Sequence, residues 1–325
     1  MTLCWGRWNL SLILLIGGSA VESAAAQAYP ARPVRFIVPF GTGGAADIIG
    51  RAVAQKLTET FGQQFIVDNR SGAGGVIGTE LTAKAAPDGY TLVLGSFSTH
   101  TGNPNLYKKL PYDPIRDFAP ISFVGTAHLV LAVHPSVPAR SVQELIALAK
   151  AKPGYLNYAS SGNGNGTHLA GELFKSLAGV DMIHIPYKTA GTAVSELVGG
   201  QVHLMFSTLA SVLPLVKAGK LRALGISSAK RSEAAPELAP IGELIKGYDV
   251  GTWFGVLAPS GTPRPIVVLL GNEIVRIITN PDVRSQLVAV GAEPHANTPE
   301  EFAQYIRTEL PRWGKIIRAA GVTLD

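Results

Sequence analysis

The sequence predicts an α/β protein of two lobes, each a mostly parallel sheet flanked by helices, with two crossing strands as the hinge. Three observations support this. Short apolar strands alternate with helical segments, two long apolar segments interrupt the alternation, and 325 residues are enough for about two domains. Because the strands are apolar on both faces, each sheet is expected to be covered by helices on both sides.

The N-terminal 28 residues have the features of a secretory signal peptide. Arg7 provides a short positive region, residues 10–18 form an apolar stretch too short to span a bilayer, and residues 26–28 read AQA, a small-residue cleavage pattern. The alternative is a buried N-terminal helix. Cleavage after residue 28 removes Cys4, the single cysteine, so the mature protein is expected in the periplasm without disulfide or thiol chemistry.

The first unit of the mature chain alternates strands and helices. A glycine-rich turn follows the first strand and leads to a helical pattern that stops at Gly62. A second glycine-rich turn leads to a helical stretch that ends at Ala86, and a Pro-Asp-Gly turn precedes the third strand. The expected strands span residues 34–40, 64–69 and 90–96, and an irregular segment follows at 103–120.

Two long apolar segments, residues 121–135 and 249–261, are candidate crossings between the lobes. The unit between them begins with Ser141 and Glu144 in a capping box, and the tail carries three helix starts, each marked by proline. Within this unit we expect strands at 156–162, 182–188, 202–207 and 221–227 and helices near 169–177 and 193–198. The expected division is 1–28 for the signal peptide, 29–127 with 253–325 for lobe I, and 128–252 for lobe II.

Composition excludes several classes of protein. Hydrophobic residues make up 46% and charged residues 16%, which excludes intrinsic disorder. No apolar run reaches the roughly 20 residues of a membrane-spanning helix. The net charge of +5 contains no basic cluster larger than a pair, so no nucleic-acid partner is expected. The 36 glycines indicate sharp turns or sites lined by backbone.

Enzyme signals are weak. Gly41-x-Gly43-x-x-Ala46 after the first strand, with Asp68 closing the second, satisfies a permissive dinucleotide fingerprint. Alanine in place of the third glycine, Pro39 before the turn and export from the cytoplasm all argue against it. The chain has no Gly-x-Ser-x-Gly elbow and no Walker loop, and its seven histidines never fall three or four apart. We expect no cofactor and no metal, although a catalytic triad of remote residues stays open.

Three polar, glycine-rich turns follow strands, at residues 39–47, 95–100 and 159–168. In parallel sheets the ligand crevice lies beyond the carboxyl ends of the strands, so the three turns are expected to face one cleft. Amides at helix N-termini attract anions, and charge-assisted bonds of about 1.5–3 kcal/mol each supply the ~8 kcal/mol of micromolar binding. The alternative is that these are ordinary loops with helix caps. The turns offer the hydroxyls of Ser96, Ser98, Thr99, Ser161 and Thr167.

Four further side chains near these turns have two interpretations each. Asp47 is either a first-turn acid that favours the helix dipole or an organiser of water that bridges to a ligand. His168, near a helix start, either donates to an anion or makes a structural hydrogen bond. Phe40 and Phe206 end strands, and each is either core packing or an apolar wall for the ligand.

Several segments occur in an order that resembles a known family: VRFIVPFGTGGAADIIGR, VDNRSGAGGVIG, APDGYTL, LNYASSGNGNGTHLAGELF and IPYKTAGTAVSELVGGQVHLMF. Over residues 29–325 the chain is similar to the periplasmic solute-binding receptors of tripartite tricarboxylate transporters, the TctC-like or Bug family. The resemblance implies a periplasmic-binding-protein-like fold and capture of a small carboxylate, with a dicarboxylate or aromatic acid favoured. It also implies delivery to the membrane subunits of a transporter by a monomeric, non-enzymatic receptor. A sensor without transport and an exported α/β enzyme are the alternatives.

The resemblance also implies which positions hold the carboxylates, partly through water. Two departures bear on the ligand: Thr42 stands where proline is common, and Ser207 stands where an acid is common, which favours a more anionic ligand than an amino acid. The positions implied by the family motifs are Phe40, Gly43, Gly44, Asp47, Ser161 and the turn from Gly164 to His168. The full set of candidate residues is Phe40, Thr42, Gly43, Gly44, Asp47, Ser96, Ser98, Thr99, Ser161, Gly164, Gly166, Thr167, His168, Phe206 and Ser207.

Overall fold

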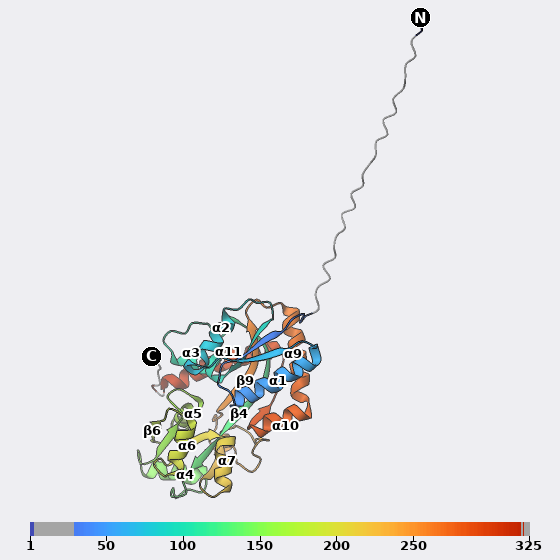
Figure 1. Ribbon diagram of the computed structural model, residues 1–325. Helices are drawn as coiled ribbons and strands as arrows, with labels where there is room; N and C mark the ends of the chain where they lie inside the picture. Colours follow the sequence, from blue (N-terminus) through green and yellow to red (C-terminus); the bar gives the residue numbers. More distant parts are fainter. Residues whose placement is uncertain (3–28, 320, 322–325) are drawn as a thin grey trace.

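The computed structural model describes residues 1–2, 29–319 and 321. The expected signal peptide, including Cys4, lies outside the described residues apart from its first two positions. The described chain forms two α/β bodies joined by the crossing strands β4 and β9 (Figure 1). This confirms the predicted two-lobed α/β class. Within the described ranges, no helix combines the length and the apolarity that crossing a membrane requires.

Lobe I is built on the strand order β2-β1-β3-β9-β4, with β10 paired to β4. Strand β1 pairs in parallel with β2 and β3, because helices carry the chain back between them. Its strands are β1 (Val34–Val38), β2 (Phe65–Asn69), β3 (Thr91–Ser96) and β10 (Ala292–Pro294). Its helices are α1 (Ala45–Phe61), η1 (Ala73–Gly75), α2 (Val76–Ala83), η2 (Ser98–Gly102), α3 (Asn103–Leu106), α9 (Arg264–Thr279), α10 (Pro281–Ala289) and α11 (Pro299–Ala319).

The two crossing strands are β4 (Phe118–Val133) and β9 (Gly251–Pro259). The first part of β4 pairs antiparallel with β9, and its last five residues pair with β7 of the other lobe. A single strand of 16 residues therefore runs through both lobes, with register shifts in its lobe I part that increase its bend. The crossing strands make each sheet mixed: strands joined by helices are parallel, whereas pairs that involve β4 or β9 are antiparallel.

Lobe II continues the sheet in the order β4-β7-β5-β6, with β8 also paired to β4. The predicted cap at Ser141 is present, since its hydroxyl accepts from the amide of Glu144. The strands of lobe II are β5 (Asn157–Ser160), β6 (Ile183–Pro186), β7 (Leu204–Thr208) and β8 (Arg222–Ile226). Its helices are α4 (Val142–Ala151), α5 (Gly166–Ala178), α6 (Ala190–Val198), α7 (Leu209–Lys217) and α8 (Ile241–Leu244).

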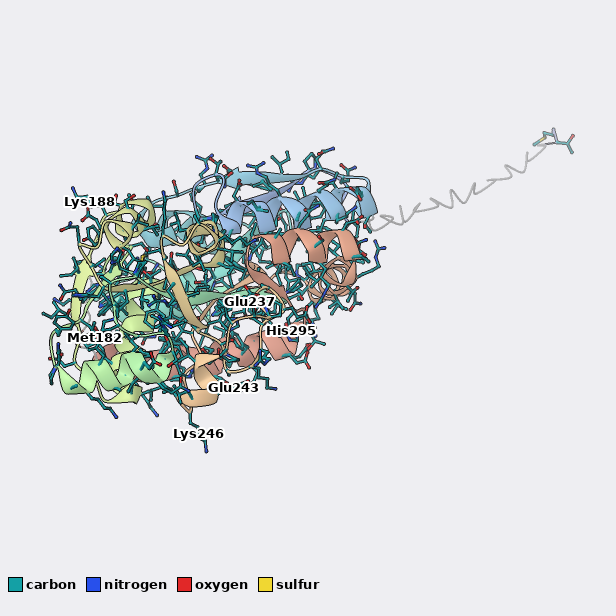
Figure 2. The ribbon with its side chains drawn as sticks, turned by 90° about the horizontal axis from the view of Figure 1, so that it is seen from below. Met182, Lys188, Glu237, Glu243, Lys246 and His295 are labelled. Carbon is teal, nitrogen blue, oxygen red and sulfur yellow. The ribbon has the colours of Figure 1, made fainter. Side chains whose placement is uncertain are left out.

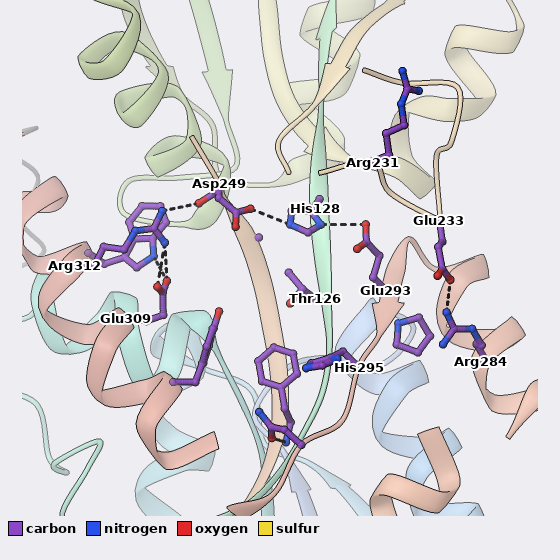
Figure 3. A pocket seen from close by; sticks show the side chains of 16 residues that line it. Thr126, His128, Arg231, Glu233, Asp249, Arg284, Glu293, His295, Glu309 and Arg312 are labelled. Atoms are coloured by element: carbon purple, nitrogen blue, oxygen red, sulfur yellow. Dashed lines mark hydrogen bonds and ion pairs between the residues drawn. The ribbon is translucent and has the colours of Figure 1, made fainter. Parts of the chain in front are cut away.

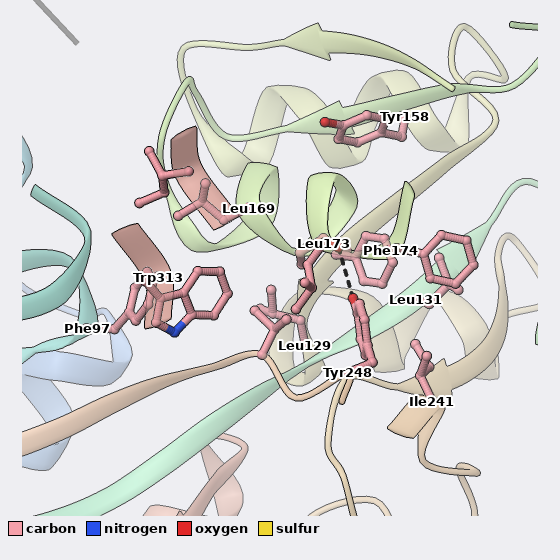
Figure 4. Packing of buried hydrophobic residues seen from close by; sticks show 14 of the residues in the cluster. Phe97, Leu129, Leu131, Tyr158, Leu169, Leu173, Phe174, Ile241, Tyr248 and Trp313 are labelled. Atoms are coloured by element: carbon pink, nitrogen blue, oxygen red, sulfur yellow. Dashed lines mark hydrogen bonds between the residues drawn. The ribbon is translucent and has the colours of Figure 1, made fainter. Parts of the chain in front are cut away.

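A continuous apolar cluster links the two lobes beside the crossing strands (Figure 4). Trp313 of α11 packs edge-on against Phe97 with ring centroids 4.8 Å apart, and Leu169 of α5 lies in the same cluster. Helix α11 therefore belongs to lobe I by its β4 contacts but also touches α5 of lobe II. The exposed side chains of Lys188 and Lys246 project from different sides of lobe II (Figure 2).

Candidate functional site

The first predicted loop joins β1 to α1 and presents backbone amides to solvent. Thr42, Gly43 and Gly44 are exposed, and Gly43 has φ +80°, a conformation that glycine adopts without strain. Gly44 is the N-cap of α1 and supplies no side-chain hydrogen bond to the first turn. The N-terminus of a 17-residue helix is therefore open to an anion, which would take the place of a capping side chain.

Asp47 braces this loop. Its carboxylate accepts from the amide of Gly43 at 2.9 Å and from Asn69 Nδ2 at 3.0 Å, and Arg51 Nε lies 3.0 Å away. Burial acts to raise the pKa of Asp47, but the bonds from Arg51, Gly43 and Asn69 outweigh it and hold the pKa below its usual value. Because both carboxylate oxygens are engaged, the structure favours the structural role for Asp47 over direct contact with a ligand.

The second predicted loop, after β3, is closed on itself. Ser96 and Thr99 are 0% exposed, and the amide of Ser96 donates to Thr99 Oγ1 at 2.9 Å. Thr99 Oγ1 also lies 2.9 Å from Nδ1 of His100, whose burial lowers its pKa to about 3. The hydroxyls of Ser96 and Thr99 therefore hold the turn and are closed to a ligand in this conformation. Ser98 is half-buried and remains a candidate.

The loops that follow β1, β2 and β3 converge at Gly75. A Cβ at this position would lie 2.7 Å from Thr99 Cγ2 and 3.3 Å from Phe40 Cζ, and the backbone has φ +94°. Gly75 therefore permits the close approach of all three loops. Sequence reasoning placed a glycine-rich turn here but assigned it no role, because only the folded sheet shows which neighbours it meets.

The third predicted loop, in lobe II, is organised by Asn165. As the N-cap of α5, its Oδ1 accepts from the amides of Thr167 and His168 at 3.0 and 3.1 Å and from Thr167 Oγ1 at 2.6 Å. Its Nδ2 donates to Ser161 Oγ at 2.8 Å, and the amide of Ser161 donates to Thr167 Oγ1 at 2.9 Å. Sequence reasoning missed Asn165, although asparagine directly before a helix is a strong N-cap signal.

The buried side chain of His168 stabilises the lobe II loop from the protein interior. Its Nδ1 accepts from the amide of Gly164 at 2.9 Å, and its ring stacks on His184 with centroids 3.8 Å apart and planes at 6°. Burial lowers the pKa of His168. The neutral imidazole therefore makes the structural hydrogen bond, which was one of the two interpretations of this residue.

Two predicted residues of β7 lie inside the protein. Phe206 is 0% exposed and packs against Phe174 and Tyr248, with ring centroids 5.8 and 6.1 Å away. Ser207 is 2% exposed and pairs with Val130 of β4. In this structure Phe206 is thus a core residue and not an open apolar wall, because it faces the helix-covered side of the sheet. Phe40 is half-buried beside Gly75.

The lobe II loop meets the crossing strands at Thr252. A Cβ on Gly166, the first residue of α5, would lie 3.4 Å from Thr252 Oγ1 of β9. The structure thus brings the lobe I loops together around Gly75 and places the lobe II loop against the hinge. Thr252 was not a predicted site residue, because no motif marks the hinge position that faces α5.

Two α/β lobes joined by crossing strands, with glycine-rich loops at helix N-termini, define a solute-binding protein of the periplasmic type. The sequence comparison identifies the family. The model of the TctC family, described as the tripartite tricarboxylate transporter family receptor, matches residues 49–322. The chain therefore belongs to this family, as the sequence motifs indicated.

Known proteins similar to this chain agree with the assignment. Protein BugT of Bordetella pertussis is 39% identical over 97% of this chain and 99% of its own length. The structure of R. palustris Rpa4515 with adipate has a TM-score of 0.79 and 36% identity, covering 91% of this chain and 99% of that one. MatC (Rpa3494) from Rhodopseudomonas palustris with bound malate has a TM-score of 0.73 and 31% identity, covering 89% and 100%.

Proposed function

We propose that the chain is a periplasmic receptor that captures a small dicarboxylate between its lobes and delivers it to the membrane subunits of a tripartite tricarboxylate-type transporter, without catalysis. Cleavage of residues 1–28 and lobe boundaries near 127/128 and 252/253 are part of the same proposal. The family assignment and the acids bound by two similar proteins, adipate and malate, support it.

The observation that carries the proposal is the open N-terminus of α1. Its approach loop, Thr42 to Gly44, is exposed and uncapped, and buried Asp47 fixes the loop before a ligand arrives. A carboxylate here would accept backbone N–H bonds and benefit from the helix dipole. Loops that are ordered in advance lose little entropy on binding, so more of the interaction free energy appears as affinity.

The lobe II loop offers a matching hydroxyl. The hydroxyl of Thr167 donates a hydrogen bond to Asn165 Oδ1, while Ser161 Oγ accepts one from Asn165 Nδ2. The Ser161 proton is therefore directed either to Thr167 Oγ1, 3.2 Å away, or to a ligand. A ligand with a carboxylate at each end would contact both lobes and so favour their closure.

The residues of the lobe I and lobe II loops disfavour a ligand that carries an ammonium group. Asp47 is the one carboxylate within residues 39–47 and 159–168, and Gly43, Asn69 and Arg51 already engage it. An α-ammonium placed between the loops would lose its water without gaining a carboxylate partner. We therefore infer selectivity for dicarboxylates over amino dicarboxylates of the same length.

Isothermal titration with two matched pairs of acids tests this function: glutarate against glutamate, and succinate against aspartate, with adipate and malate alongside. We expect saturable binding of at least one dicarboxylate, with its amino counterpart weaker by about tenfold or more, equivalent to about 1.4 kcal/mol. NMR of the released acid should show it unchanged. Equal affinity within both pairs, no binding of any acid, or a reaction product would contradict the proposal.

A further inference from the structure

A pocket of about 490 Å³ lies beside the crossing strands and is lined from both lobes (Figure 3). Lobe I contributes β10, α10 and α11, whereas lobe II contributes the segments that precede β9 and follow β8. None of the candidate ligand residues lines this pocket. The charged groups that the argument uses are His128, Glu233, Asp249, Arg284, Glu293 and Arg312.

This pocket is on the opposite face of the β4–β9 ribbon from the lobe II ligand loop. His128 of β4 is paired with Gly251 of β9, and the next pair along the ribbon is Ala127 with Thr252. Because successive residues of a strand point to opposite faces, Thr252 and His128 project from opposite faces. Thr252 lies beside Gly166 at the start of α5, so His128 and its pocket are behind the hinge.

His128 bridges the lobes with both ring nitrogens. Nε2 lies 3.2 Å from Asp249 Oδ1, and Nδ1 lies 3.3 Å from Glu293 Oε1 (Figure 3). Asp249 belongs to lobe II, since the neighbouring amide of Val250 donates to Ser227 O. Glu293 belongs to lobe I, in β10. A proton on His128 thus joins a carboxylate of each lobe.

The environment of His128 favours its charged form. Burial lowers the pKa of His128, but the bonds and charges of Asp249 and Glu293 outweigh it and raise the pKa to about 9. The pKa of Glu293 is correspondingly below its usual value: burial opposes ionisation, and His128 and then Ser232 outweigh it. At neutral pH the charged ring therefore makes one charge-assisted hydrogen bond, to Asp249, and an ion-pair contact with Glu293.

Two further polar contacts cross the hinge on the same face. Arg284 of α10 pairs with Glu233 of lobe II. Arg312 of α11, held by Glu309, donates from Nη2 to the carbonyl of Asp249 at 3.2 Å. Three other ionisable groups line the pocket: Arg231, bonded to the carbonyl of Pro236, His295, packed on Phe123, and Tyr305, packed on Phe123 and Trp253. Burial raises the pKa of Tyr305.

We propose that His128, held between Asp249 and Glu293, is a proton-dependent latch that opposes closure of the lobes on their ligand. The inference rests on the proposed function. Rotation about the crossing strands that brings the ligand loops together on one face separates the groups on the opposite face. The bridging contacts behind the hinge are then lost, so the ligand must offset them, and its apparent affinity is reduced.

The sign of the pH dependence follows from this. In the latched state His128 has a raised pKa of about 9, and in the closed state it loses its carboxylate partners and its pKa falls. Closure therefore releases a proton at neutral pH. The latch opposes closure with its full free energy at pH values below the pKa that His128 has in the closed state. This contribution is lost as the pH rises through about 9, the pKa of His128 in the latched state. Ligand affinity should rise with pH and level off above about 9.

Calorimetry with adipate between pH 6.5 and 10, in buffers of different ionisation enthalpy, tests the latch. We expect the apparent Kd to fall about three- to tenfold and then level off, with proton release on binding. His128→Gln should bind at the high-pH affinity throughout, and Glu293→Gln should move the plateau to lower pH. His295→Gln lines the same pocket and should behave as the unmodified chain. A flat profile without proton release, or weaker binding by a folded His128→Gln, would overturn the latch.

A ligand-free measurement separates failure of the latch from failure of the proposed function. Spin labels on cysteines placed at exposed Gln55 of lobe I and Lys188 of lobe II, in a Cys4→Ser chain, report the distance between the lobes. We expect a narrow distribution at pH 7 that broadens at pH 10 as the latch is lost. Identical distance distributions at both pH values would refute the latch even if adipate binds. A pH-dependent distribution in a protein that does not bind adipate would instead contradict only the proposed ligand.

Discussion

Replacing Asn165 with alanine is expected to weaken adipate binding about ten- to a hundredfold, equivalent to about 1.4–2.8 kcal/mol. The side chain accepts three hydrogen bonds from Thr167 and His168 and donates one to Ser161. Without it, the Ser161 and Thr167 hydroxyls lose their fixed directions and the loop must be ordered by the ligand. Loss of the N-cap should also cost about 1 kcal/mol of stability. Titration calorimetry and thermal unfolding measure the two effects separately.

Asn163→Ala is the matched control for this substitution. Asn163 is in the same loop and has the same side chain, but it is exposed. We expect its removal to change adipate affinity by less than about twofold, since surface substitutions of this kind act within ±0.5 kcal/mol. Equal effects of the two substitutions would show that Asn165 does not organise the binding loop.

Gly171→Val is expected to lower the unfolding temperature by about 6–12 °C, corresponding to about 3 kcal/mol. A Cβ at Gly171 of α5 would lie 2.3 Å from Tyr158 Cε2 and 2.7 Å from Cζ, and the ring is wholly buried. The helix or the ring must therefore move. Because the hydroxyl of Tyr158 donates to Glu172 in the middle of the same helix, that displacement also strains this hydrogen bond.

Gly191→Ala, in helix α6, is expected to stabilise the protein and serves as the control for Gly171→Val. Gly191 of α6 is exposed, and a Cβ there would meet no atom closer than 3.9 Å. Alanine has the higher helix propensity, so the protein should become more stable by up to about 1 kcal/mol. A Gly171→Val protein as stable as the parent would mean that α5 does not pack on Tyr158 as described.

The fold was largely predictable because the signals were long and repetitive. Strands such as 34–38 are almost continuously apolar and precede helical patterns, and the crossing at 121–135 was apparent from its length alone. Shorter elements carried no such signal. Helix η2 (Ser98–Gly102) was not predicted, because its polar residues are ordered by contacts around Thr99, and β10 is only three residues long.

The candidate site was predictable as loops but less so as side chains. After β1, Thr42 to Gly44 are exposed, and after β5, Ser161, Gly166 and Thr167 are half-buried, as a binding loop must be, although Gly164 between them is buried. Polar residues next to them were harder to assign. Ser96 and Thr99 satisfy each other within the turn, and Phe206 is on the covered side of β7, which depends on strand register and neighbours far along the chain.

The most direct test of the central claim is a crystal structure of the chain with adipate. We predict one carboxylate within about 2.7–3.2 Å of the backbone amides of Gly44 and Ala45, at the uncapped N-terminus of α1, and the other at the Ser161 hydroxyl, with the lobes closed between them. The contacts of His128 to Asp249 and Glu293 should then be longer than the present 3.2 and 3.3 Å. Adipate in the pocket behind the hinge, or on one lobe only, would contradict the account.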